Sequence, residues 1–83
     1  MKKFWKYVPW GTDVEEYDSL DDVKRDIHLA YTLGAEEQAY AVVTEDDVVI
    51  ESLWEDEDDR WVREEPMLGM EFEEVLDRYA CGR

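Results

Sequence analysis

The sequence predicts a single α+β domain, residues 1–83, in which a small antiparallel sheet packs against two amphipathic helices in the order β-α-β-β-β-α. Residues 38–65 alternate short runs rich in valine, isoleucine, tyrosine and tryptophan with acidic turns, a pattern typical of consecutive antiparallel strands. Apolar residues recur at helical spacing before and after this stretch. Because each helix has one apolar face, we expect a two-layer domain with both helices on the same side of the sheet.

The first predicted element is an edge strand within residues 2–10. This segment is dense in aromatic and β-favouring residues, and the strand should end near Val8, because Pro9 has no N–H to donate and Gly11 follows. Residues 12–18 are acidic and are expected to form a connector.

A well-marked helix follows over residues 19–33. Ser19 is a good N-cap, Asp21 and Asp22 suit the positive end of the helix dipole, and Gly34 is placed to end the helix. The apolar face comprises Leu20, Val23, Ile27, Ala30 and Tyr31.

Two hairpins are predicted next. Strands over 39–44 and 48–54 flank an acidic turn, and pairing Trp54 with Trp61 leaves a four-residue loop over 56–59, a favoured hairpin length. In this register one sheet face would carry Ala41, Val43, Val48, Ile50 and Trp54.

The last predicted element is a helix over residues 71–81. Pro66 ends the third strand of the ribbon, and Gly82 stops the helix. Its apolar face comprises Phe72, Val75, Leu76 and Tyr79, which are spaced i, i+3, i+4, i+7.

The charge balance bounds the classes of partner. The chain has twenty-four acidic and nine basic residues, which gives a net charge of −15. Such a surface repels nucleic acid and anionic membranes but attracts basic protein surfaces. Without an apolar run of membrane-spanning length or a signal-peptide pattern, and with Cys81 as the sole cysteine, we expect a cytoplasmic protein. The alternative is that the acidity serves only solubility or a halophilic habitat.

Enzymatic activity, a bound cofactor and a dedicated metal site are not expected. His28 is the only histidine, and neither it nor Cys81 stands in a recognisable catalytic motif. A calcium-binding EF-hand loop starting at Asp56 would need Gly and Glu where Trp61 and Met67 stand.

The ordered carboxylates are the best functional clue. Alternate strand residues lie about 6.6 Å apart and i, i+4 helix neighbours about 5–6 Å apart, so acidic side chains can be spaced comparably with backbone phosphates. A protein with such a surface would occupy a nucleic-acid-binding channel lined by Lys and Arg. The predicted partner-binding residues are Glu45, Asp46, Asp47, Glu55, Asp56, Glu57, Asp58 and Asp59, extended by Glu71, Glu73, Glu74 and Asp77.

In composition and predicted architecture the chain resembles the small acidic inhibitors of phages and mobile elements, the anti-CRISPR and anti-restriction proteins. The expected function is an inhibitor that mimics nucleic-acid charge and binds the basic surface of a nucleic-acid-binding enzyme. From the length and the net charge we expect a monomer or homodimer with no direct nucleic-acid or membrane contact. The alternative is an interaction module, such as an immunity protein, antitoxin or adaptor, that binds a basic protein without imitating nucleic acid.

Overall fold

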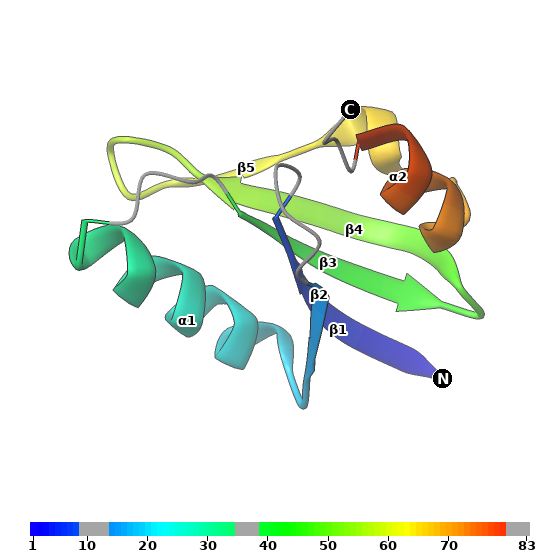
Figure 1. Ribbon diagram of the computed structural model, residues 1–83, viewed down its shortest axis with the longest axis horizontal. Helices are drawn as coiled ribbons and strands as arrows, with labels where there is room; N and C mark the ends of the chain where they lie inside the picture. Colours follow the sequence, from blue (N-terminus) through cyan, green and yellow to red (C-terminus); the bar gives the residue numbers. More distant parts are fainter. Residues whose placement is uncertain (9–13, 35–38, 80–83) are drawn as a thin grey trace.

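The computed structural model describes residues 1–8, 14–34 and 39–79 of the chain. They form one antiparallel sheet of five strands in the order β2-β1-β3-β4-β5, with one helix on each face (Figure 1). The elements are β1 (Lys2–Tyr7), β2 (Val14–Tyr17), α1 (Leu20–Thr32), β3 (Tyr40–Glu45), β4 (Val48–Glu55), β5 (Trp61–Arg63), the 3₁₀ helix η1 (Glu65–Met67) and α2 (Phe72–Tyr79).

The α+β class and the order of the predicted helices and strands are confirmed, and the structure adds one strand. β2 forms inside the stretch expected to be a connector, and it pairs with β1 along its whole length. β1 therefore lies between β2 and β3 and is not an edge strand. The charged side chains of Glu15 and Glu16 are exposed, as suits an edge strand.

The two helices cover opposite faces of the sheet, so the domain has three layers where two were expected (Figure 1). Val23 and Ile27 of α1 pack in a cluster with Ala41 on one face, whereas Phe72 and Val75 of α2 pack in a second cluster on the other face. The central strands carry apolar residues on both faces, and each face needs its own cover. If both helices lay on one face, the apolar cluster on the other face would be exposed.

A bulge on β4 changes the predicted sheet faces. The pairing of β3 with β4 shifts between Val43 and Thr44, which makes Ile50 the additional residue on β4. Because a one-residue shift exchanges the two faces, Leu53 and not Trp54 lies on the face that packs against α1. The shared face predicted for five residues is therefore wrong from Ile50 onward, and Ile50 itself is 39% exposed.

The end signals predicted for the first helix are confirmed. The Ser19 side chain accepts a hydrogen bond from the backbone N–H of Asp22 at 3.2 Å. At the other end Gly34 has a φ of 92°, and its N–H donates to the carbonyl of Tyr31. The predicted end of the second helix at Cys81 and Gly82 lies outside the described residues.

A polar cluster attaches α1 to the sheet. Asp26 of α1 accepts hydrogen bonds from the Tyr17 hydroxyl and, at 2.9 Å, from the Lys6 ammonium. The Tyr17 hydroxyl, and then Lys6, hold the pKa of the Asp26 carboxyl below its usual value. Burial, and then the bond to Asp26, raises the pKa of Tyr17. Folding therefore favours a neutral Tyr17 beside an ionised Asp26.

Candidate functional site

The turn between β3 and β4 presents two adjacent carboxylates in an unusual backbone conformation. Glu45 pairs with Val48, so Asp46 and Asp47 form a two-residue loop. Their φ values are 53° and 66°, as a type I′ hairpin turn requires at both positions. Asn and Gly adopt this conformation most readily, yet the sequence has two aspartates there. Both side chains are exposed.

The start of α2 is tied to this turn by backbone hydrogen bonds. The N–H of Phe72 donates to the carbonyl of Asp47 at 2.8 Å, and Glu71 forms an isolated bridge with Val48. These contacts bring the exposed Glu71 and Glu73 beside the turn aspartates. Two stretches predicted from sequence as separate acidic segments thus lie at one end of the sheet.

These four carboxylates line a groove of about 500 Å³, which we call the acidic groove. Its apolar lining includes Trp5, Phe72 and Leu76, and the rings of Trp5 and Phe72 lie 5.0 Å apart. The indole N–H of Trp5 donates to the Thr44 hydroxyl at 3.0 Å, which fixes the ring. The groove therefore combines an aromatic wall with the carboxylates Asp46, Asp47, Glu71 and Glu73.

The negative charge of the acidic groove is only weakly compensated. Lys3 is the one basic side chain among the described residues that line it. Asp46 lies 3.9 Å from the N-terminal ammonium of Met1, but both groups are about 90% exposed, and such pairs contribute little. Asp47, Glu71 and Glu73 have no ion-pair partner within residues 1–8, 14–34 and 39–79.

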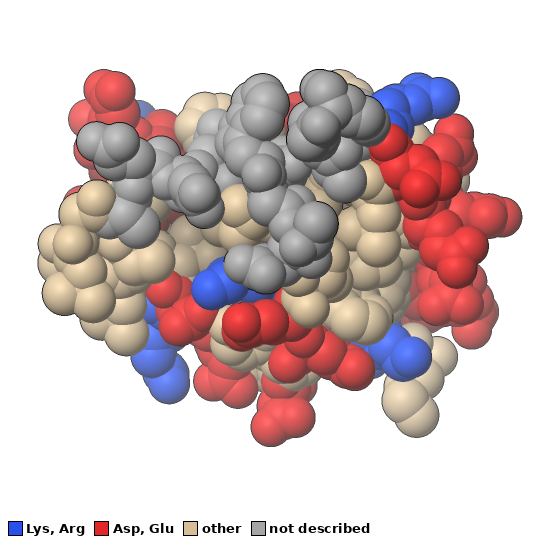
Figure 2. Space-filling view, in the orientation of Figure 1, with Lys and Arg blue, Asp and Glu red and all other residues tan. Residues whose placement is uncertain are grey.

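The second acidic hairpin lies at the opposite end of β4. At about 3.3 Å per residue, the eight residues of β4 separate the two turns by roughly 20–25 Å. In Figure 2 acidic side chains gather at the edge occupied by the β3–β4 turn and α2, at the β4–β5 loop, and also along the lower edge over α1 and β2. The predicted partner-binding residues thus form two separate groups.

The register of the second hairpin differs from the prediction by one residue. Trp54 pairs with Val62 and Glu55 with Trp61, so the loop has five residues, 56–60, where four were expected. Asp56 explains the longer loop, because its Oδ1 accepts hydrogen bonds from the backbone N–H groups of Asp58 and Arg60, each at 2.9 Å. Asp56 is thus engaged in holding the loop together.

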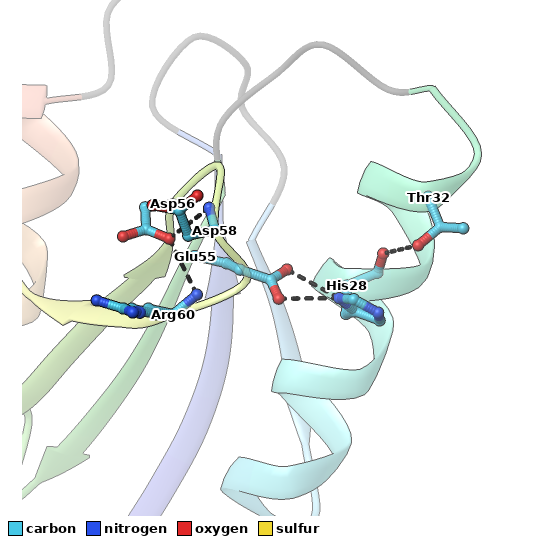
Figure 3. Close-up of polar contacts among 6 residues, drawn as sticks. All are labelled: His28, Thr32, Glu55, Asp56, Asp58 and Arg60. Atoms are coloured by element: carbon cyan, nitrogen blue, oxygen red, sulfur yellow. Dashed lines mark hydrogen bonds and ion pairs between the residues drawn. The ribbon is translucent and has the colours of Figure 1, made fainter.

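Glu55, predicted to lie on the partner-binding surface, is buried. Its side chain is 4% exposed and points at α1, where its carboxylate lies 2.8 Å from Nδ1 of His28 (Figure 3). Glu55 lies two residues after Leu53 on β4, and side chains two positions apart on a strand share a face. Both residues therefore lie on the α1 face. The pair could not be expected from the sequence, because the bulge on β4 reverses the faces of the residues that follow it.

The remaining predicted residues are exposed and differ in their contacts. Glu57, Asp58 and Asp59 project from the β4–β5 loop, and Glu45 lies at the end of β3. Glu74 forms an ion pair with Arg78 one turn later in α2, at 3.3 Å. The exposed Asp77 lies on the same helix.

Neither described helix has the length and apolar character needed to cross a membrane. Comparisons of the chain with protein-family models, with curated proteins and with solved structures gave no match, so the chemistry of its own residues has to carry the argument about function.

Proposed function

We propose that this protein is a non-enzymatic acidic inhibitor that occupies the basic, nucleic-acid-binding surface of another protein, in the manner of anti-CRISPR or anti-restriction proteins. The observation that carries the proposal is the acidic groove, in which four exposed carboxylates with little local compensation surround an aromatic wall. A surface of this kind attracts Lys and Arg side chains and speeds association with a basic partner.

The apolar lining gives the groove a preference among cations. The aliphatic stem of a Lys or Arg side chain can pack on apolar surface while its charged head reaches the carboxylates. Arg in addition stacks on aromatic rings such as that of Trp5. We therefore propose that a basic side chain of the partner enters the groove, with the second acidic hairpin available to a basic region roughly 20–25 Å away.

The apolar lining also favours a second candidate, a module that binds a basic protein without imitating nucleic acid. Phosphate mimicry requires charge alone, whereas the Trp5–Phe72 wall adds contacts that nucleic-acid phosphates do not make. Both candidates predict binding that weakens with salt, so salt dependence does not separate them. Competition does, because a mimic and a nucleic acid exclude each other at one site.

The test is a pull-down with the tagged full chain from lysate of the source cells, eluted with salt or with added DNA or RNA. For the proposed inhibitor we expect a nucleic-acid-binding protein that is released by nucleic acid at constant ionic strength. Competition is then repeated with the purified partner. A partner that binds the protein and nucleic acid simultaneously would refute mimicry and support the interaction module.

A matched pair of double variants locates the contact. Asp46→Asn with Asp47→Gly removes two charges from the acidic groove and keeps its turn conformation. Glu57→Gln with Asp58→Asn removes two charges from the other hairpin and serves as the control. We expect the first variant to weaken partner binding about tenfold, or about 1.4 kcal/mol, and the control to have a smaller effect. A groove variant that binds the partner as tightly as the wild type would show that the groove is not the contact.

A further inference from the structure

Three potential metal ligands from separate parts of the chain meet where the β4–β5 hairpin contacts α1. They are His28 of α1, Glu55 at the end of β4 and Asp59 in the following loop. One ligand atom from each residue lies within 4.8 Å of the other two. This group is remote from the acidic groove, because β4 separates the two ends.

Each ligand is held by a different feature of the fold. Glu55 occupies the last position of β4 and points at α1 by strand alternation. His28 directly follows the buried Ile27 and so lies at the margin of the helix face that packs on the sheet. Asp59 is exposed, in contrast to Asp56, whose Oδ1 is already engaged by backbone N–H groups.

Glu55 is a buried carboxylate that Lys and Arg side chains of the described residues do not neutralise. A buried carboxylate is unfavourable unless a positive charge or several donors accompany it. Among the described residues, His28 is its only hydrogen-bonding side chain, at 2.8 and 3.1 Å, and no Lys or Arg of these ranges forms an ion pair with it. Lys24, one turn before His28, instead places its ammonium 5.3 Å from the centre of the Trp61 ring. A metal cation beside Glu55 would supply a positive charge at this buried position.

We propose that His28, Glu55 and Asp59 form a binding site for a divalent transition-metal ion, with Zn²⁺ as the best fit. One imidazole nitrogen and two carboxylates are ligands that Zn²⁺ accepts, whereas Mg²⁺ and Ca²⁺ prefer oxygen alone. With bonds of about 2.0–2.1 Å, the ligands of a tetrahedral zinc ion lie about 3.3 Å apart. Nδ1 of His28 and Oε2 of Glu55 lie 2.8 Å apart, and all three ligand atoms lie within 4.8 Å of one another. Small side-chain movements would therefore bring the three atoms to the spacing that zinc requires.

Metal binding at this place would fasten the hairpin loop to α1. The three ligands come from residues 28, 55 and 59, so one ion would join the helix to both the strand and the loop. His28 would bind through Nδ1 as a neutral imidazole, and the ion would replace the direct contact between His28 and Glu55. The consequence is stabilisation of the folded chain, which does not depend on the proposed partner.

The test titrates the full-length protein, first treated with a chelator, with Zn²⁺ by calorimetry and follows its thermal unfolding. We expect one zinc ion per chain and, at a hundredfold excess over Kd, a rise in Tm of about 10 °C or more. The imidazole NMR signals of His28 should also shift on binding, and they are readily assigned because His28 is the only histidine. The same concentration of Mg²⁺ controls for weak binding to the many surface carboxylates and should not reproduce these effects.

Four variants make the test specific. His28→Gln and Asp59→Asn alter exposed side chains and should each weaken zinc binding at least about tenfold, since loss of outer-sphere partners alone costs that much. Asp58→Asn and Cys81→Ser should leave the affinity unchanged. Folding of each variant is checked by its Tm in chelator. Absence of stoichiometric zinc binding, or affinity unchanged in the His28 variant, would overturn the proposal.

Discussion

Replacing the Asp46–Asp47 turn with Asn-Gly should stabilise the protein although it removes two native side chains. Both aspartates have positive φ, at 53° and 66°, where an L-residue is disfavoured by roughly 1–2 kcal/mol, and less for Asp and Asn. Gly at position 47 removes this strain but loses about 0.5–1 kcal/mol through the greater freedom of the unfolded chain. The ion pair of Asp46 with the N-terminus is almost fully exposed, so its loss matters little.

Relief of repulsion adds to this gain, because the two carboxylates are adjacent in a chain of net charge −15. We expect a net stabilisation of about 1 kcal/mol, which corresponds to about 4–8 °C in Tm for a domain of this size. Urea unfolding followed by tryptophan fluorescence measures the change, and an unchanged slope with denaturant shows that the surface exposed on unfolding is the same.

The matched control is Asp46→Ala with Asp47→Ala, which removes the same charges but disfavours positive φ. We expect this variant to be less stable than the wild type by about 1 kcal/mol or more. The two variants therefore differ in backbone preference at equal charge. If both stabilised the protein equally, charge alone would explain the effect and the argument from turn conformation would be refuted.

Three further predictions concern α1 and its attachment to the sheet. Ile27→Ala empties a site that is 2% exposed and should cost about 3 kcal/mol, seen as a lower urea midpoint; a loss below about 1 kcal/mol would contradict the packing of α1 on the sheet. Ser19→Ala removes the N-cap and should cost about 1 kcal/mol in the same assay, whereas Ser19→Asp should retain the cap. Tyr17→Phe should cost about 1 kcal/mol at pH 7. Because the pKa of Asp26 is lowered in the folded state, its ionisation stabilises the fold above about pH 4, and this stabilisation is lost as the pH falls through the pKa of the folded protein. The difference in stability between wild type and Tyr17→Phe should therefore shrink at pH 3.

The helices and the central strands could be predicted because their signals are local. Ser19 and Gly34 mark the ends of the first helix. The turn at residues 46–47 contains neither Asn nor Gly, but the two β-favouring runs that flank it predict its position. Each of these features depends on residues within a few positions of one another. Local patterns therefore predicted both helices, the central strands and the class of the fold.

The layers and the sheet faces depended on interactions that local patterns do not contain. The bulge at Ile50 has no glycine to mark it, and it reverses every later face of β4. The stretch 14–17 has too few apolar residues to predict an edge strand, and pairing with β1 decides its structure. The same bulge turns Glu55 toward α1. Without the bulge the strand pattern places Glu55 on the opposite face, and its burial could not be predicted.

The carboxylates of this chain have separate tasks, and the net charge of −15 therefore overstates the charge available to a partner. Asp26 anchors α1, Asp56 holds a loop together and Glu55 is buried beside His28. If zinc binds at His28, Glu55 and Asp59, the ion would also offset negative charge at that end of the sheet. The acidic groove would then be the more strongly negative end, and a basic partner would bind there in one orientation. The effect of zinc on partner affinity should accordingly be small for the groove and larger for contacts at the β4–β5 loop.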